Sequence, residues 1–358
     1  MIKVVTVVGA RPQFVKAAVL SRIFEKHPQF EEILVHTGQH FDANMSEVFF
    51  TDMEIPKPKY NLDIHGVGHG AMTGRMLEKI EGVLETEKPD ILLVYGDTNS
   101  TLAGALAAKK MHIPVGHVEA GLRSFNMQMP EEVNRILTDR ISDLLFCPTQ
   151  SALDNLSQEG FDHFDAKVIR SGDVMQDAAL FYAKRSAEKS NIMSQLPQHF
   201  LLCTLHRAEN TDNEERLAAF VNGLNRVHKE VAPVVIPLHP RTKSKLAAQN
   251  LKLEVEVIDP VGYFDMIELL KHCQLVLTDS GGLQKEAFFF EKSCLTLRDQ
   301  TEWTELVQYG FNRLVKPEEN LTEIAKDALL KQSDFSKELY GRGKAGEEIV
   351  ESILKHCS

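Results

Sequence analysis

Short runs of apolar residues alternate with amphipathic, helix-like stretches along the whole chain. This alternation is typical of parallel α/β sheets, in which buried strands are linked by crossover helices. At 358 residues the chain is expected to form two such domains. The predicted strands are Lys3–Val8, Ile33–His36, Ile91–Tyr95, Val115–Glu119, Leu144–Cys147, Phe200–Leu205, Val234–Leu238, Val255–Ile258, Leu275–Thr278 and Cys294–Leu297.

The chain has one stretch, near residues 170–195, where strand signal fades and polar residues dominate. We therefore predict a first domain over residues 1–171 and a second from residue 172 onward. Ligands of open α/β sheets bind at the carboxyl ends of the strands. Functional residues are accordingly expected immediately after strands.

The bulk composition excludes several classes of function. A formal charge of -11 argues against nonspecific nucleic-acid binding, which needs a basic face. No apolar run approaches the roughly 18 residues that would span a membrane, and the N-terminal apolar run is read as the first core strand. The five cysteines are scattered and predicted to be buried thiols. The histidines show no metal-ligand spacing, and no dinucleotide or P-loop fingerprint occurs, so neither a metal nor a cofactor is expected.

Polar residues follow the first predicted strand and the strand Ile91–Tyr95. In GARPQFVKA, Gly9 allows a tight turn, and Arg11 stands at a predicted helix start, where it can pair with phosphate. The alternative is that Arg11 pairs with a neighbouring carboxylate. Asp97, in GDTNST, can either present its carboxylate to a ligand or only cap the following helix.

Further carboxylates follow the next strand. Glu119 ends an otherwise apolar strand, where an unpaired charge would be costly to bury. Glu131 begins a predicted helix in PEEVNR, with Arg135 one turn later. Acidic residues at a helix start commonly only complement the helix dipole. Carboxylates that share a site shift each other's pKa, however, so that one can serve as acid and another as base.

The second half carries a predicted nucleotide site. His206 and Arg207 follow one strand, and His239 and Arg241 follow another; such pairs suit a diphosphate. In TDSGGLQKEA, two glycines at a helix start let backbone N–H groups approach phosphate oxygens, and a glutamate one turn later can accept from a ribose diol. The alternative is a simple tight turn with a serine cap. The residues concerned are Ser280, Gly281, Gly282 and Glu286.

Taken in order, these motifs resemble the non-hydrolysing UDP-N-acetylglucosamine 2-epimerases across nearly the whole chain. The series runs GARPQFVKA, GQHFD, YGDTNST, HVEAGLRS, PEEVNR, GDVMQDA, LHRAEN, PLHP, TDSGGLQKEA and LRDQTEW. The resemblance implies an α/β, glycosyltransferase-B-like fold of two Rossmann-like domains facing across a deep cleft. It also implies a second domain ending at residue 339, a C-terminal helix of about 340–358 that packs on the first domain, a homodimer, and a cytoplasmic enzyme of envelope polysaccharide synthesis.

The resemblance implies reversible inversion of C2 in a UDP-sugar, by elimination of UDP to a glycal and its re-addition, without a cofactor. It implies catalytic roles for Asp97, Glu119, Glu131 and His206. The residues it assigns to the substrate and to UDP are Arg11, Lys16, Arg135, Arg207, His239, Arg241, Met266, Ser280, Gly281, Gly282, Glu286 and Arg298.

Several departures from the family pattern bear on the substrate. The usual RPE is RPQF here, with Gln13, and Arg241 stands where asparagine is usual. Gln39 and His40 of the activating second-substrate site remain, but Asp42 and Gly66 replace the expected residues. Together with Phe125, Asn126 and Met129, these features resemble the branch that acts on UDP-2,3-diacetamido-2,3-dideoxy-glucuronate. A neutral UDP-N-acetylglucosamine-type sugar is the first expectation, and the uronate is the alternative.

Other classes of function compete with epimerisation. A glycosyltransferase of the same fold would need an acceptor site and would leave several carboxylates without a role. A hydrolysing epimerase would release UDP and free sugar. A binding module without catalysis fits worst, because carboxylates beside an anionic ligand would only repel it.

Overall fold

The structure is a computed structural model that describes residues 1–39, 50 and 54–357. The chain forms two compact units. Unit 1 contains Met1–Ala178 and Glu338–Ser358, and unit 2 contains Ala179–Lys337. Helix α7, Val174–Lys189, begins in unit 1 and ends in unit 2. Residue 171, the expected end of the first domain, directly precedes the short turn into this helix.

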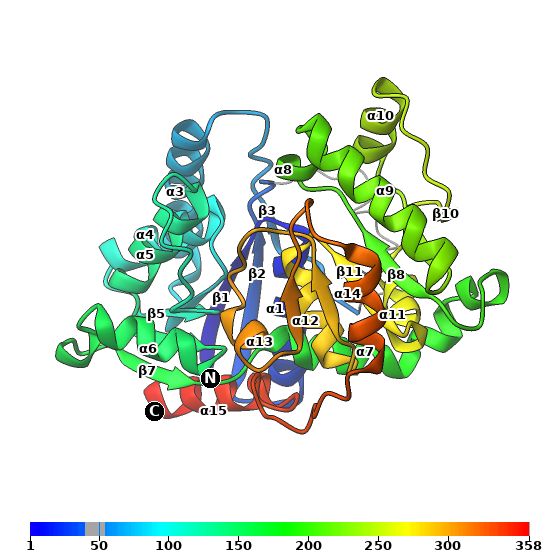
Figure 1. Cartoon of the computed structure of the whole chain (residues 1–358). Helices are drawn as coiled ribbons and strands as arrows, with labels where there is room; N and C mark the ends of the chain where they lie inside the picture. Colours follow the sequence, from blue (N-terminus) through cyan, green and yellow to red (C-terminus); the bar gives the residue numbers. More distant parts are fainter. Residues whose placement is uncertain (40–49, 51–53, 358) are drawn as a thin grey trace. The chain divides into compact units, whose positions relative to one another are not determined.

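Unit 1 is built on a seven-stranded parallel sheet in the order β3-β2-β1-β4-β5-β6-β7 (Figure 1). Its central strands are buried apolar runs, as expected for a parallel sheet covered by helices on both faces. The strands are β1 Ile2–Val8, β2 Phe30–His36, β3 Tyr60–Asn61, β4 Ile91–Tyr95, β5 Val115–Val118, β6 Leu144–Cys147 and β7 Lys167–Arg170. The helices are α1 Arg11–Lys26, α3 His69–Glu87, α4 Asn99–Lys110, α5 Pro130–Ile141, α6 Gln150–Gln158 and α15 Ala345–Cys357, with a short 3-10 turn η1 at Phe161–His163.

Unit 2 repeats the pattern with a six-stranded parallel sheet in the order β10-β9-β8-β11-β12-β13. The strands are β8 Leu201–Thr204, β9 Val234–Pro237, β10 Glu256–Ile258, β11 Leu275–Thr278, β12 Cys294–Thr296 and β13 Asn312–Leu314. The helices are α8 Ala208–Thr211, α9 Glu214–Glu230, α10 Pro240–Ala248, α11 Tyr263–His272, α12 Gly281–Phe289, α13 Thr304–Gln308 and α14 Leu321–Leu330, with a 3-10 turn η2 at Ile192–Gln195. The predicted α/β class is confirmed in both units.

In each sheet the strand order reverses direction at one place. The switch lies between β1 and β4 in unit 1 and between β8 and β11 in unit 2. Open α/β sheets leave a crevice at such switch points, outside the carboxyl ends of the strands. The segments that follow these four strands therefore hold the places where a ligand site is expected.

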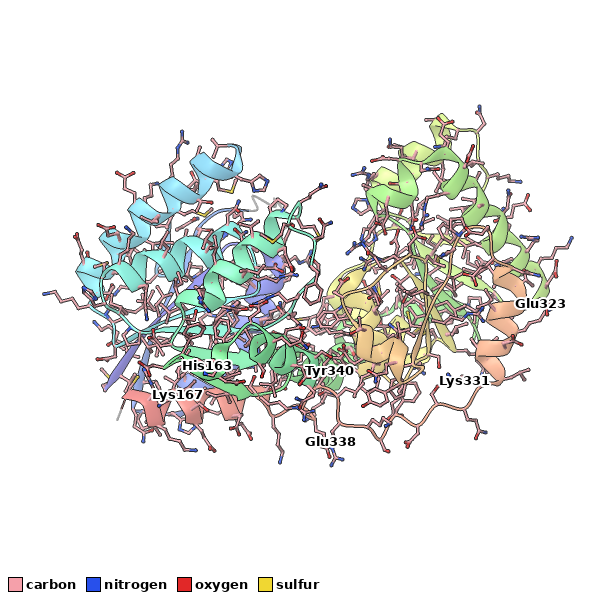
Figure 2. The ribbon with its side chains drawn as sticks, turned by 60° about the vertical axis from the view of Figure 1, so that its left-hand side comes forward. His163, Lys167, Glu323, Lys331, Glu338 and Tyr340 are labelled. Carbon is pink, nitrogen blue, oxygen red and sulfur yellow. The ribbon has the colours of Figure 1, made fainter. Side chains whose placement is uncertain are left out.

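The C-terminal segment returns to unit 1. The Tyr340 carbonyl accepts a hydrogen bond from the Asp173 amide (2.8 Å), and the Glu338 carbonyl accepts one from Arg170 (3.3 Å); Figure 2 labels Glu338 and Tyr340. Helix α15 then packs on α1 so closely that a Cβ at Gly346 would lie 2.7 Å from side-chain atoms of α1. The Asp177 carboxylate caps the start of α15 by accepting from the Ala345 and Gly346 amides.

Candidate functional site

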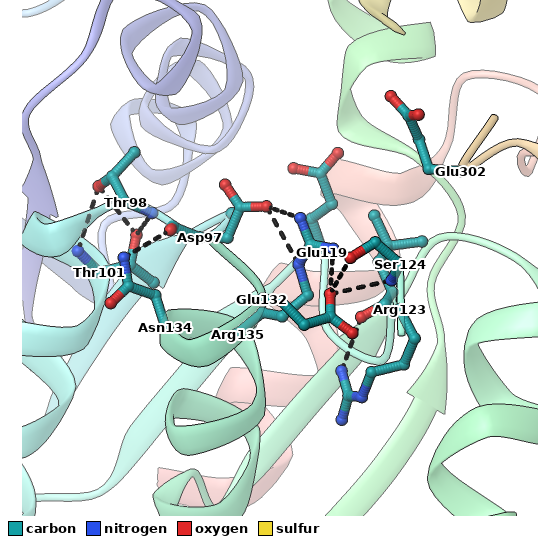
Figure 3. A network of polar contacts seen from close by, with 12 residues as sticks. Asp97, Thr98, Thr101, Glu119, Arg123, Ser124, Glu132, Asn134, Arg135 and Glu302 are labelled. Carbon is teal, nitrogen blue, oxygen red and sulfur yellow. Dashed lines mark hydrogen bonds and ion pairs between the residues drawn. The ribbon is translucent and has the colours of Figure 1, made fainter. Parts of the chain in front are cut away.

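The turn after β4 leaves the Asp97 carboxylate partly exposed and does not use it as the cap of the following helix. Thr98 is the N-cap of α4, and its side chain accepts from the Thr101 amide. The Asp97 carboxylate is instead bound by Arg135 of α5, through both Nη2 and Nε (3.1 Å), as Figure 3 shows. About a third of the Asp97 side chain is exposed, so a ligand can reach it.

A second glutamate, Glu132, holds Arg135 in place. Its carboxylate is buried and accepts from Arg135 Nη1 (2.7 Å), the amides of Ser124 and Phe125, and the Ser124 hydroxyl (Figure 3). Glu131, which sequence reasoning selected, is exposed in the first turn of α5. Its carboxylate makes no hydrogen bond or ion pair with the described residues, and its role stays a prediction.

Glu119 stands in a strained backbone conformation just after β5. Its φ of 73° lies in the left-handed region, which costs a non-glycine residue about 1–3 kcal/mol and is found mainly at functional sites. Its carboxylate forms an ion pair with Lys16 of α1, and both side chains are nearly buried. A Cβ at Gly96 would lie 3.4 Å from the Glu119 carboxylate, so Glu119 lies beside the turn that carries Asp97.

Two carboxylates of unit 1 thus meet with different electrostatic surroundings. Burial raises the pKa of Asp97, Arg135 partly offsets this, and the nearby charge of Glu119 raises the pKa further. Glu119 is paired with a lysine instead. Such a difference suits a site in which one carboxyl group gives a proton and another takes one.

The turns that carry Arg11 and Asp97 are joined by Gln13, whose function sequence reasoning missed. The Gln13 side chain is buried and fully hydrogen-bonded. Its Oε1 accepts from the Gly9 (2.8 Å) and Ala10 (3.0 Å) amides. Its Nε2 donates to the Tyr95 carbonyl (2.6 Å) and contacts two threonine hydroxyls of the next turn. Arg11 itself is the first residue of α1 and is partly exposed.

Gln13→Leu is expected to lower kcat about tenfold, because small displacements of the turn that carries Asp97 cost rate steeply. A leucine can neither accept from the Gly9 and Ala10 amides nor donate to the Tyr95 carbonyl. The measurement is kcat against that of Gln150→Leu, an exposed glutamine in the same unit. Equal kcat of the two folded variants would contradict this role.

In unit 2, a pocket of about 300 Å³ gathers six of the predicted site residues, five assigned to binding and one, His206, to catalysis. It lies at the carboxyl ends of β8, β9 and β11, at the switch point of this sheet. Met266, in the first turn of α11, contributes an apolar wall between the pocket and the core. The predicted residues that line the pocket are His206, His239, Met266, Ser280, Gly282 and Glu286.

Asp279 fixes the backbone of the pocket residues by accepting hydrogen bonds from it. It was not among the predicted site residues. It is fully buried and accepts from the backbone amides of His206 and Arg207 and from the Asn210 side chain, at 2.9–3.2 Å. The His206 ring lies with Nδ1 3.4 Å from the same carboxylate. Burial lowers the pKa of His206, and Asp279 works against that shift. The signal was present in the sequence, because Asp279 directly follows a buried strand and precedes Ser280.

The second His-Arg pair consists of His239, which can face a ligand, and Arg241, which forms a surface ion pair. His239 is the N-cap of α10, and its Nδ1 accepts from the Arg241 amide (3.2 Å). Its Nε2 therefore carries the ring hydrogen and can donate to a ligand. The Arg241 guanidinium forms a half-exposed ion pair with Asp212 (2.6 Å), which Lys245 shares.

The start of α12 combines space for a ligand with two nearby arginines. Nothing lies within 4 Å of a Cβ placed on Gly282, whereas one on Gly281 would lie 2.3 Å from the Glu302 carboxylate. Arg298 donates to Glu302 (2.9 Å), and Arg207 lies 3.9 Å from it. Ser280 caps the helix, with its hydroxyl accepting from the Leu283 amide. Backbone N–H groups here can meet an anion with both arginines close by.

Within residues 1–39, 50 and 54–357, no cluster of three or more histidine, cysteine, aspartate or glutamate side chains is arranged to hold a metal ion. No helix in that same part of the chain has the length and apolar character needed to cross a membrane. His40 and Asp42 of the expected second-substrate site lie outside the described residues. Gln39 accepts from the Ser100 amide and hydroxyl.

Comparison with known proteins finds similarity to UDP-sugar 2-epimerases over nearly the whole chain. The family model described as UDP-N-acetylglucosamine 2-epimerase matches residues 22–354. The chain is 58% identical over 354 residues to a UDP-2,3-diacetamido-2,3-dideoxy-D-glucuronate 2-epimerase of Pseudomonas aeruginosa, covering 99% of both chains. It is 46% identical to a UDP-N-acetylglucosamine 2-epimerase homolog of Methanococcus maripaludis, covering 98% of this chain and 99% of the other.

A solved structure extends this likeness to the fold. The UDP-GlcNAc 2-epimerase of Methanocaldococcus jannaschii, in complex with UDP-GlcNAc and UDP, matches with a TM-score of 0.87 and 42% identity. The match covers 99% of this chain and all of that one.

Proposed function

Since the chain belongs to the UDP-N-acetylglucosamine 2-epimerase family and is an epimerase of UDP-sugars at C2, we propose that its substrate is UDP-2,3-diacetamido-2,3-dideoxy-glucuronate. The observation that carries this proposal is the 58% identity to an epimerase of that sugar over 99% of both chains. Relatives named for UDP-N-acetylglucosamine reach 46% or less among those compared. The RPQF motif and the Phe125–Met129 segment support the same branch.

The uronate carries a carboxylate that a neutral hexosamine lacks, so a cation is needed to meet it. Arg241 was the sequence-based candidate. Its guanidinium instead forms an ion pair with Asp212, and both side chains are about half exposed. This ion pair explains Arg241 without any contact to the substrate. The proposal therefore does not depend on Arg241.

For the reaction, we propose elimination followed by re-addition. The C1–O bond to the diphosphate breaks, UDP leaves with its electron pair, and a base takes the C2 proton, which leaves a C1–C2 double bond. UDP then adds back to C1 while a proton returns to C2 on the opposite face. Asp97 and Glu119, with Glu131, serve as the acid and base groups, because opposite faces of the ring require separate groups.

Unit 2 is proposed to bind UDP. The backbone N–H groups of Gly281 and Gly282, of which only Gly282 has open space beside it, bind the diphosphate together with the side chains of His206, Arg207 and Arg298. Glu286 binds the ribose diol, and Met266 packs on the uracil. In unit 1, Arg11, Lys16 and Arg135 are proposed to contact the substrate. Stabilising the leaving diphosphate is the largest expected catalytic contribution, because the C2 hydrogen of the sugar is only weakly acidic before UDP departs.

The test is side-by-side kinetics on the two nucleotide sugars in deuterated water. We expect higher kcat/KM on the diacetamido uronate, a hyperbolic rate curve, and solvent deuterium at C2 of the product. Higher kcat/KM on UDP-N-acetylglucosamine with a sigmoidal curve would assign the chain to the neutral-sugar branch. Steady release of UDP without an acceptor would indicate a hydrolysing enzyme, and dependence on an added sugar acceptor would indicate a glycosyltransferase.

We also propose that the enzyme is a cytoplasmic homodimer that supplies sugars for envelope polysaccharide. The family resemblance supports this assembly and setting. Light scattering during size-exclusion chromatography measures the molar mass of the protein. A mass equal to that of one chain would contradict the dimer.

A further inference from the structure

A buried set of ionisable side chains in unit 1, His117, Asp139 and Arg123, is bonded to backbone groups near Asp97 and Glu119. His117 is on β5, points into the protein and is fully buried. Its Nε2 lies 2.7 Å from the Gly96 carbonyl, and its Nδ1 lies 2.6 Å from Asp139 Oδ1. Gly96 immediately precedes Asp97, so one end of this set is bonded to the turn that presents that carboxylate.

The other end of the set is bonded to the segment that follows Glu119. Asp139 Oδ2 accepts from the Gly121 amide (3.1 Å) and from Arg123 Nη1 (2.7 Å). Arg123 also donates twice to Glu159, at 2.6 and 2.8 Å. A single chain of hydrogen bonds thus joins Gly96, next to Asp97, to Gly121, two residues beyond Glu119.

The partners of the His117 ring determine its hydrogens. A backbone carbonyl can only accept, and an ionised carboxylate can only accept. Both ring nitrogens of His117 face such groups, so both must donate.

The backbone near Glu119 has an unfavourable conformation that neighbouring groups must hold in place. Glu119 holds a left-handed φ, and its amide and that of Ala120 both donate to the Phe146 carbonyl, at 3.1 and 3.0 Å. Gly121 also has a positive φ, of 78°, and a Cβ there would lie 2.5 Å from the Ala152 carbonyl. Such a segment persists only where its surroundings fix it.

We propose that His117, as a doubly protonated ring bonded to Asp139, is a positioning residue that fixes the spacing of Asp97 and Glu119. It acts through the Gly96 carbonyl and, by way of Asp139, through the Gly121 amide. The proposal rests on the proposed acid/base function of these two carboxylates. It adds a requirement that the His117–Asp139 pair hold Asp97 and Glu119 in place. The pair does so through backbone groups and not through the side chains of Asp97 and Glu119.

The kinetic test uses His117→Gln, which offers one amide donor in place of two ring donors. The control is His163→Gln, an exposed histidine of the same unit that is labelled in Figure 2. We expect kcat of His117→Gln to fall about 10- to 100-fold, because small displacements of reacting groups cost rate steeply. Affinity for UDP, whose proposed pocket is in unit 2, should stay within about twofold of the control. Unchanged kcat in a folded His117→Gln protein would overturn the proposal.

The spectroscopic test uses the wild-type enzyme and so does not depend on the variant folding. Side-chain nitrogen NMR at neutral pH should show one histidine with both ring nitrogens protonated and with hydrogens that exchange slowly. His117 is the one buried histidine among the described residues, which identifies its signal, and that signal should be missing from His117→Gln. A slowly exchanging ring with one bare nitrogen would overturn the proposal. Full activity of Asp97→Asn would instead refute the acid/base assignment, whatever the ring signal shows.

Discussion

Asp97→Asn and Glu119→Gln are each expected to lower kcat by about 10²-fold or more, the scale of lost general acid/base catalysis. Both substitutions keep the shape of the side chain and remove its ability to exchange a proton. In the Asp97→Asn protein, Arg135 can still donate to the amide oxygen of the new side chain, so the local fold should persist. Affinity for UDP should be nearly kept, because the proposed nucleotide pocket is formed by unit 2.

The measurement is turnover of the nucleotide sugar, together with calorimetric titration of UDP. Asp154→Asn, an exposed aspartate of α6, is the matched control and should retain wild-type turnover. Near-normal kcat in both Asp97→Asn and Glu119→Gln would remove these carboxylates from the chemistry. Loss of turnover together with loss of UDP affinity would mean that they bind substrate rather than transfer protons.

Asp279→Ala is expected to lower the free energy of unfolding by about 3 kcal/mol or more, a cost typical of buried donors that lose a charged partner. Three N–H donors converge on this fully buried carboxylate, from His206, Arg207 and Asn210. UDP affinity should fall as well, since the segment that carries His206 and Arg207 loses its anchor. Asp279→Asn, which keeps one acceptor oxygen, should lie between the wild type and Asp279→Ala.

Urea denaturation and UDP titration measure these two effects. The control is Asp299→Ala, because Asp299 forms an exposed ion pair with Arg216 in the same unit. Exposed pairs contribute only about 0–1 kcal/mol. Equal stability of the Asp279→Ala and Asp299→Ala proteins would show that the buried carboxylate does not anchor the pocket.

The strands that sequence reasoning found are all central in their sheets except β10, whereas those it missed are all edge strands. Central strands such as β4 and β11 are buried on both faces, so they read as continuous apolar runs with clear ends. The strands that were missed, β3, β7 and β13, all lie at a sheet edge. Edge strands are short and carry polar residues, which removes the pattern that identifies a strand. Three predicted strands, Ile91–Tyr95, Leu144–Cys147 and Leu275–Thr278, match the structure at both ends, and the ends of the others differ by at most three residues.

In the site, residues marked by their place directly after a strand were predicted, whereas residues that act through partners distant in sequence were not. Asp97, Glu119 and His206 were predicted because each directly follows an apolar strand, and parallel strands end at one edge of the sheet. Gln13 and His117 were not assigned. Gln13 bonds the Tyr95 carbonyl, 82 positions along the chain, and the partner of His117 is a carbonyl one strand away. A polar residue inside an apolar strand, as in VGHVE, was the available signal for His117.

The return of the C-terminal segment to unit 1 has a consequence for synthesis on the ribosome. Helix α15 packs on α1, and its residues are synthesised only after the whole of unit 2, whereas those of α1 are synthesised before it. Unit 2 is contiguous in the chain and can fold as soon as it emerges, whereas unit 1 must wait with one face of α1 uncovered. The unit that carries Asp97 and Glu119 is therefore completed last, although its sheet is synthesised first.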